Sequence, residues 1–179
     1  MSEHGKSTLA ALLEEKPKRG RPPRVVSRKN VYVSLTPEQK QGVENMVGEL
    51  PDNFGRADIP DMAVNLLAIR MELLRRDVAD RDREIPEGVT DLESLFLLWD
   101  LPLPSEEVEP AWTSIRLSPQ QAIELGRIHG VLKAMFGVNR SQVYWLSLTL
   151  FGQFLHSELA GKSFESLPEV NAWMHRIYL

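Results

Sequence analysis

The sequence predicts a mostly helical protein in which one strand–helix–helix unit occurs twice. The stretches Val31–Gln39 and Thr113–Gln121 are equivalent, since each alternates in polarity before a Thr-Pro or Ser-Pro step. Each is followed by two segments with helical periodicity. The 179 residues are 42% hydrophobic and 26% charged, which is typical of a globular protein. Matching elements in the same order indicate an internal repeat.

The first copy is expected at 30–76 and begins with a strand. Residues from Asn30 to Leu35 alternate with a period of two, as half-buried strands do. Thr36 suits an N-cap and Pro37 suits the first helical position, so a helix should follow directly. The inward strand residues would be Val31, Val33 and Leu35.

The first helix of this copy should end at Pro51–Gly55, where proline, asparagine and glycine favour a turn. A second helix is expected from near Asp58, which would be its N-cap, to about Asp77. Its apolar residues recur at helical spacing and are Met62, Leu66, Leu67, Ile69, Leu73 and Leu74.

The second copy is expected at 112–158 and follows the same plan. Ser118 would cap its first helix, and Phe136-Gly137 would end that helix as the equivalent of Phe54-Gly55. Its second helix should begin at Asn139. The inward strand residues would be Thr113, Ile115 and Leu117.

Three segments lie outside the copies, and two of them should each contain a helix. An acidic linker at 77–111 should contain a short helix at Asp91–Trp99, and the C-terminal segment 159–179 should contain a helix from Leu167. Both helices are expected to cover the core. Self-association through the C-terminal helix is an alternative role.

Charge is distributed unevenly along the chain, whose net charge is −4. Residues 16–29 contain seven Lys or Arg and no acid, whereas residues 77–110 contain eleven acids against two arginines. Prolines and glycine prevent a continuous helix near the N-terminus, so 1–29 is predicted to be a disordered basic arm. Positive charge concentrated in one segment favours a nucleic-acid partner, although the net charge of the chain is negative.

The order strand, Thr/Ser-Pro, helix, helix resembles the ribbon-helix-helix family, the fold of the Arc and methionine repressors. The second copy is the closer match, through Ser114–Pro119 and Asn139–Val143. The resemblance implies that two units pair their strands antiparallel and intertwine four helices over one core. Both halves lie in this chain, so a tandem ribbon-helix-helix pseudo-dimer with extra short helices is expected. Strand exchange between two chains would satisfy the same contacts and stays open.

Strand pairing decides which side chains face outward. A two-stranded ribbon fits the major groove of B-DNA, where outward side chains meet base edges. Arg116 can pair with guanine O6 and N7, and Asn30 can serve adenine. The expected base contacts are Asn30, Tyr32, Ser34, Trp112, Ser114 and Arg116.

The start of each second helix should lie near a DNA phosphate, because free N–H groups and the helix dipole favour an anion. Asn139, Arg140 and Ser141 suit this role in the second copy. The first copy is acidic between Ala57 and Asp61 and includes a proline, which lacks an N–H. Phosphate contacts by the two copies are therefore expected to be unequal.

The segment Pro17–Arg24 resembles an AT-hook, whose Arg-Gly-Arg-Pro core lies extended in the minor groove of A·T-rich DNA. Glycine allows close approach, and arginines exploit the negative potential of a narrow groove. The alternative is a generic basic tail that binds phosphates by counterion release. The arm residues assigned to DNA are Lys18, Arg19, Gly20, Arg21, Pro22 and Arg24.

These patterns predict a protein that binds double-stranded DNA in the cytoplasm, associated with the nucleoid, most simply a transcriptional repressor. The nearest alternative is an accessory factor of plasmid or mobile-element relaxosomes or partition, with a relaxase as partner. An antitoxin-like regulator that binds a toxin is a third. No catalytic cluster, metal-ligand spacing or cofactor motif is visible in the sequence, so neither an enzyme nor a metal or cofactor site is expected. The absence of an 18-residue apolar run predicts no membrane partner.

Overall fold

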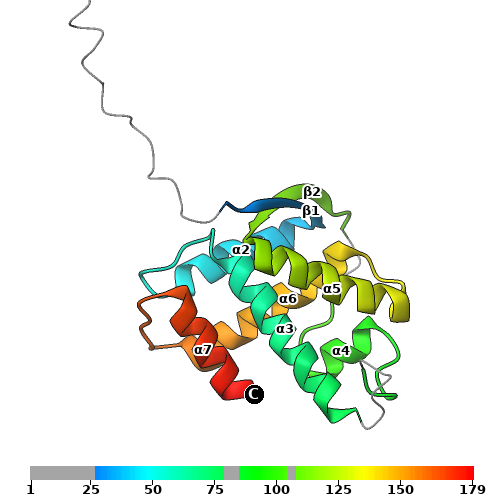
Figure 1. Cartoon of the computed structure of the whole chain (residues 1–179). Coiled ribbons are helices and arrows are strands. Elements are labelled where there is room, and N and C mark those ends of the chain that lie inside the picture. The colour runs from blue at the N-terminus through cyan, green and yellow to red at the C-terminus, as the bar shows by residue number, and fades with distance from the viewer. Residues whose placement is uncertain (1–26, 79–84, 105–107) are drawn as a thin grey trace, which may run out of the picture.

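The computed structural model describes residues 27–78, 85–104 and 108–179. Within these ranges the chain is mostly helical with one two-stranded antiparallel sheet, as predicted. Figure 1 shows the two strands on top of a helical layer, with α4 and α7 below. The elements are β1 (Lys29–Leu35), α2 (Pro37–Glu49), α3 (Ile59–Asp77), α4 (Leu92–Leu98), β2 (Ala111–Leu117), α5 (Pro119–Phe136), α6 (Arg140–Phe154), a π-helical segment η1 (Leu155–Leu159) and α7 (Leu167–Tyr178).

Strands β1 and β2 pair within the one chain, and their register agrees with the sequence repeat. Tyr32 lies opposite Ser114, and these two residues also occupy equivalent positions in the two copies. The pairing is therefore two-fold symmetric about the Tyr32–Ser114 pair. The flanking pairs are Asn30–Arg116 on one side and Ser34–Trp112 on the other.

The inner face of this β1–β2 ribbon is buried, as the alternation predicted. A slip of one residue in register would turn these side chains to solvent, so the hydrophobic pattern specifies the register strongly. The fully or nearly fully buried residues are Val33, Leu35, Ile115 and Leu117, and the partly buried ones are Val31 and Thr113.

Both first helices begin at the predicted Thr-Pro and Ser-Pro steps. The Thr36 hydroxyl accepts the N–H of Gln39, and the Gln39 side chain accepts the N–H of Thr36, so α2 begins with a capping box. Ser118 accepts the N–H of Gln121 at the start of α5. However, the N–H of Ser118 donates to Asp61 of α3 at 2.8 Å. The second copy is thus tied to the first by a hydrogen bond at its helix start.

The predicted breaks at Pro51–Gly55 and at Phe136-Gly137 are both confirmed, but Phe54-Gly55 and Phe136-Gly137 do not lie at equivalent places. Helix α5 does extend to Phe136, and Gly137 closes it with a left-handed φ of 71°. Helix α2 ends earlier, at Glu49, because the residue before Pro51 is pushed out of the helical region. Phe54-Gly55 consequently lies in the loop between α2 and α3.

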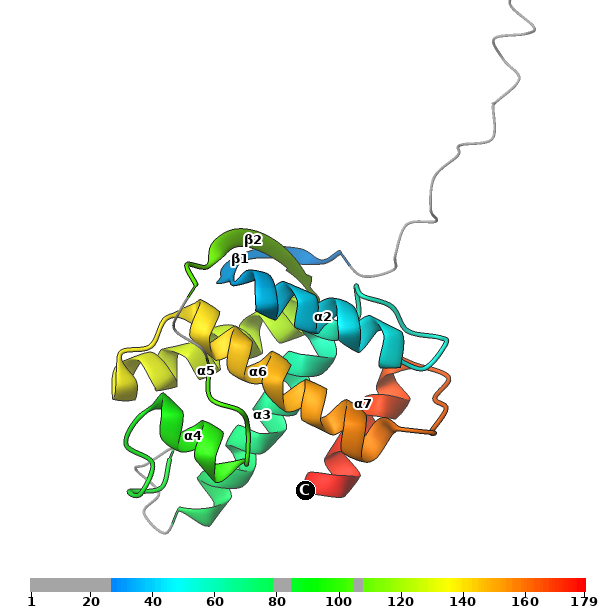
Figure 2. The ribbon, with the colours of Figure 1, turned by 180° about the vertical axis from the view of Figure 1, so that it is seen from behind.

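Helices α3 and α6 form the centre of the helical layer. Helix α3 packs against α5, α6 and α7, and α6 also contacts β1 and α2. Figure 2 shows the same layer from behind, with α6 crossing it and α7 beyond its end. In the described ranges no helix is both long and apolar enough to span a membrane.

The covering role predicted for the two extra helices is confirmed. Leu95 and Phe96 of α4 are fully buried, as are Val170 and Met174 of α7. Trp173 also packs against the core. The apolar residues Val170 and Met174 of α7 are therefore used within the chain.

Arg70 of α3 joins the covering elements to the core. Its guanidinium carbon lies 5.3 Å from the centroid of the Trp99 ring and 5.1 Å from that of Tyr178. Burial lowers the pKa of Arg70, and the two aromatic faces stabilise its positive charge. The end of α4 and the end of α7 are thus held to the same side chain.

Tyr144 of α6 is fully buried, and burial raises the pKa of its phenol above the ordinary value. The folded state therefore keeps the proton after the unfolded state has lost it, so this stability is complete below about pH 10 and falls as pH rises further. We expect Tyr144→Phe to flatten the fall in Tm between about pH 9 and 11, measured by circular dichroism. Tyr32→Phe, at an exposed tyrosine, should keep the wild-type slope. Identical slopes for all three proteins would contradict the expectation.

Candidate nucleic-acid interface

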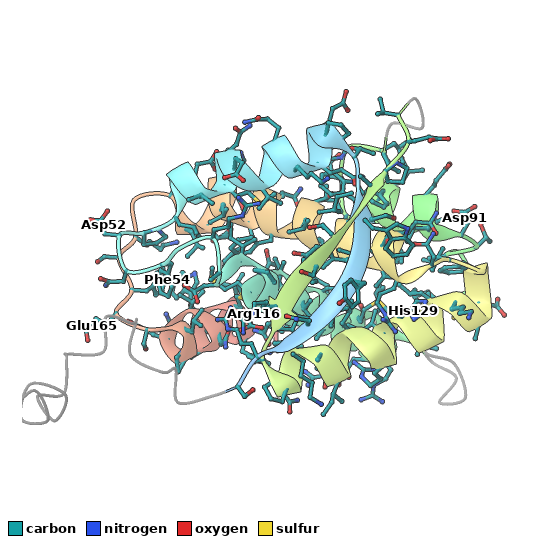
Figure 3. All side chains as sticks on the ribbon, turned by 90° about the horizontal axis from the view of Figure 1, so that it is seen from above. Asp52, Phe54, Asp91, Arg116, His129 and Glu165 are labelled. Carbon is teal, nitrogen blue, oxygen red and sulfur yellow. The ribbon has the colours of Figure 1, made fainter. Side chains whose placement is uncertain are left out.

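The outer face of the ribbon exposes most of the residues predicted to contact bases. Tyr32 is 65% exposed and Trp112 is 76% exposed, although both are large and aromatic. Asn30, Ser114 and Arg116 are also exposed. Figure 3 looks down on this face, where the ribbon crosses between α2 and α5 and carries Arg116. Side chains from both strands therefore share one solvent-facing surface.

Ser34 departs from the predicted pattern because it is only half-exposed. Its N–H donates to the Ser141 hydroxyl at 2.8 Å, which joins β1 to the first turn of α6. The two residues were predicted to contact a base and a phosphate, respectively. The structure brings them together, and the Ser141 oxygen is already an acceptor within the fold.

The start of α6 is closed by its own side chains. The Asn139 side chain accepts the N–H of Gln142 at 3.0 Å, and the Gln142 side chain accepts the N–H of Asn139 at 2.9 Å. Arg140 is exposed and forms no ion pair with any residue that the structure describes. Of the three predicted phosphate contacts, Arg140 is the side chain most available to an anion.

Positive potential extends from Arg140 to the end of α5. Burial is the main cause that lowers the pKa of His129, and the charges of Arg140 and Lys133 lower it further. His129 lies on α5 at the side of the ribbon face (Figure 3). The contributions of Arg140 and Lys133 reflect a positive potential at this place, which favours an anion, whereas the contribution of burial does not.

The acidic start of α3 is neutralised inside the fold. Asp58 is the N-cap residue of α3, as predicted, but its side chain makes no capping hydrogen bond. The Arg28 guanidinium lies 3.0 Å from one Asp58 oxygen and 3.2 Å from an Asp61 oxygen, and it also donates to the Ala57 carbonyl. The second Asp58 oxygen accepts the N–H of Gly55 at 3.1 Å. These contacts occupy the carboxylate that would otherwise cap the helix.

Arg28 is part of the core structure, although the sequence groups it with the basic arm. Only 10% of its side chain is exposed, against 19% for Asp58 and 11% for Asp61. Two acids at a helix start, with an arginine just before a strand, are a sequence signal that could have suggested this cluster. The pairing itself spans 30 residues and depends on the fold.

A surface pocket lies on each side of the ribbon, at the start of a second helix. The first has a volume of about 310 Å³ and includes Ser34, Asn139 and Ser141 at the start of α6. Phe96 of α4 and Pro104 of the linker also line it. Linker and α4 side chains therefore lie beside the start of α6.

The second pocket, of about 350 Å³, lies at the start of α3 and is lined by three cations and no acid. Arg56 is paired with Glu44. Lys40 and Arg116 have no ion pair with any residue in the described ranges. Three positive side chains therefore line the pocket at the start of α3, where the acidic residues Asp58 and Asp61 are already paired with Arg28. Sequence reasoning missed Lys40 and Arg56, since only the fold brings α2 and its following loop beside Arg116.

The predicted minor-groove arm, Lys18 to Arg24, lies outside the described residues. The point where it joins the fold is described. Strand β1 begins at Lys29, opposite Leu117 and next to the Asn30–Arg116 pair. The arm is therefore attached at the ribbon end that carries Arg116.

Comparison with known proteins finds no family model, no curated protein and no solved structure that matches this chain.

Proposed function

We propose that the chain binds double-stranded DNA sequence-specifically, with the β1–β2 ribbon in the major groove. The observation that supports this most strongly is the ribbon register, which is two-fold symmetric at the same residues that the sequence repeat makes equivalent. An antiparallel ribbon with exposed side chains has the width and surface to read base edges. The two strand–helix–helix units around one core support assignment as a tandem ribbon-helix-helix pseudo-dimer.

Each candidate side chain has a role that follows from its chemistry. Arg116 would pair with guanine in bidentate fashion and Asn30 with adenine. Tyr32 and Trp112 offer apolar contact with thymine methyl groups, and Ser114 offers a small polar contact. These assignments rest on the exposure of the side chains and on the strand register, which places them on one face.

Phosphate contacts would come from the flanks of the ribbon. Arg140 at the start of α6 would serve one flank, and Lys40 with Arg56 would serve the other. The basic arm over 18–24 would add minor-groove contacts beside the Arg116 end. Such contacts position the protein on the duplex and supply most of its salt-dependent affinity.

The simplest biological role is repression of transcription by occupancy of an operator, in the cytoplasm at the nucleoid. An accessory role in plasmid or mobile-element DNA processing is the second candidate. It is favoured by Leu97, Leu98 and Leu103 around α4, which are each more than half exposed and offer apolar contacts to a protein partner such as a relaxase or toxin. Footprinting separates these roles: protection upstream of the chain's own gene supports repression, and protection at a transfer origin supports the accessory role.

Salt dependence tests the proposal and the role of the arm together. We expect the full chain to bind duplex DNA with log Kobs falling linearly with log salt, by about 0.9 for each phosphate contacted. Deletion of residues 1–26 should make this slope shallower by about 0.9 for each phosphate that the arm neutralises. Fluorescence anisotropy at several salt concentrations measures both slopes.

The control is Arg76→Ala, which removes an exposed charge at the end of α3 far from the ribbon. It should leave the slope unchanged. Absence of binding by the full chain at about 50 mM salt would refute the proposed function. Binding with the same slope after deletion would instead show that the arm makes no phosphate contacts.

A further inference from the structure

We infer that the chain binds a non-palindromic duplex in one orientation, because the two ends of its ribbon present different chemistry. This inference rests on the proposed function and adds the class of DNA site that would be recognised. It follows from the strand register, which determines which residues of one copy lie beside which residues of the other.

One end of the ribbon is polar and cationic. Asn30 lies opposite Arg116, and both side chains are exposed. The amide and the guanidinium are the two side-chain groups best suited to bidentate contacts with purine edges, Asn with adenine and Arg with guanine. This end is thus built to read hydrogen-bonding groups in the major groove.

The other end is aromatic. Trp112 lies opposite Ser34, and Trp112 is 76% exposed whereas Ser34 is half-buried. An indole offers a broad apolar surface with a single donor, and a serine offers one short hydroxyl. Contacts of this kind suit thymine methyl groups better than guanine edges.

The repeat makes the comparison between the ends direct. When the two copies are aligned at Tyr32 and Ser114, the position equivalent to Arg116 is Ser34, and the position equivalent to Asn30 is Trp112. In a homodimer these positions would carry identical residues, and the two half-sites would be identical as well. Here the backbone pairing is two-fold symmetric, but the outward side chains that would contact bases differ between the two ends.

The pockets beside the ribbon also differ between its two ends. The Arg116 end adjoins the pocket that contains Lys40 and Arg56. The Trp112 end adjoins the start of α6, where Phe96 and Pro104 border the pocket. A duplex bound in reverse would be mismatched at both ends at once. Each mismatched base pair lowers the affinity by about 5- to 150-fold.

Single tagged residues can report the orientation, because the chain contains no cysteine. Glu38 and Gln120 are exposed, equivalent positions at the starts of α2 and α5, directly after the two strands. The full chain would first be used to select duplexes from a random pool. An iron chelate would then be attached to the variant Glu38→Cys or Gln120→Cys, and the bound variant would cut the selected duplexes near its tag. We expect a non-palindromic consensus, with each tag cutting on one side only and the two tags on opposite sides.

The outcomes separate the two proposals. A palindromic consensus, or cutting on both sides by each tag, would overturn the single orientation while leaving DNA binding intact. Failure to enrich any sequence would instead refute the proposed function. One-sided cutting at a non-palindromic consensus supports both.

A symmetrised ribbon tests whether the ribbon ends cause the orientation. The double variant Ser34→Arg/Trp112→Asn would place an Asn–Arg pair at each end, and we expect it to select a palindrome and to cut on both sides. Gln41→Arg adds the same charge at an exposed site on α2 and should keep one-sided cutting. If the symmetrised chain, shown by circular dichroism to be folded, still cuts on one side, the ribbon ends do not determine orientation.

Discussion

Replacement of Arg116 by alanine is expected to abolish most of the sequence preference while leaving affinity for unrelated duplexes nearly unchanged. The side chain is exposed on the ribbon, beside Asn30, and has no ion pair in the described ranges to compete with DNA. A bidentate arginine–guanine contact contributes about 1–3 kcal/mol of discrimination. The dissociation constant for a scrambled duplex divided by that for the selected duplex should therefore fall by about 5- to 150-fold.

The scrambled duplex distinguishes base reading from phosphate binding. If Arg116 bound a phosphate instead, its removal would weaken binding to both duplexes equally and would make the salt slope shallower by about 0.9. Arg76→Ala should change neither constant, since that residue lies at the far end of α3 and pairs with Glu72. Equal weakening on both duplexes would show that the ribbon is not the element that reads sequence.

Arg28→Met is expected to lower the free energy of unfolding by about 3 kcal/mol, because it leaves buried carboxylates without a counter-charge. Asp58 and Asp61 both lie within 3.2 Å of this guanidinium and are largely shielded from solvent. Asp61 also accepts the N–H of Ser118, so disturbance at α3 reaches the start of α5. Urea unfolding followed by circular dichroism measures the change.

A surface arginine provides the matched control for this effect. Arg76→Met removes an exposed ion pair and should cost no more than about 0.5 kcal/mol. The double variant Arg28→Met/Asp58→Asn should lose less than the sum of the single changes, since removal of one carboxylate relieves part of the unpaired charge. A change for Arg28→Met as small as that for Arg76→Met would show that the cluster contributes little to folding.

Local signals made the elements predictable. The Thr-Pro and Ser-Pro steps mark the starts of α2 and α5, and the period of two separates Val33 from Tyr32. These patterns depend on neighbours within a few residues, so the sequence contains them in full. The early end of α2 was also readable, because Pro51 disfavours helix in the residue before it.

Long-range contacts made the site only partly predictable. Ser34 and Ser141 are 107 residues apart, and Asp61 and Ser118 are 57 apart, so no local pattern indicates that they meet. The same holds for Lys40, which becomes a neighbour of Arg116 only after the strands pair. The outward residues could be predicted from alternation, whereas their grouping into two unlike ends required the register.

The wide separation of the two strands in sequence has a consequence for biosynthesis. Helices α2, α3 and α4 are all synthesised after Tyr32 of β1 and before its partner Ser114 of β2. At ribosomal speeds of about 5–20 residues per second, β1 emerges on the order of 10 s before the strand that completes its hydrogen bonds. During that interval the nascent first half exposes an unpaired strand edge and the apolar face of α3, which is a state that other nascent copies or chaperones can bind. Positive charge at Lys29, at the head of this strand, is the kind of feature that discourages edge-to-edge pairing between neighbouring nascent chains.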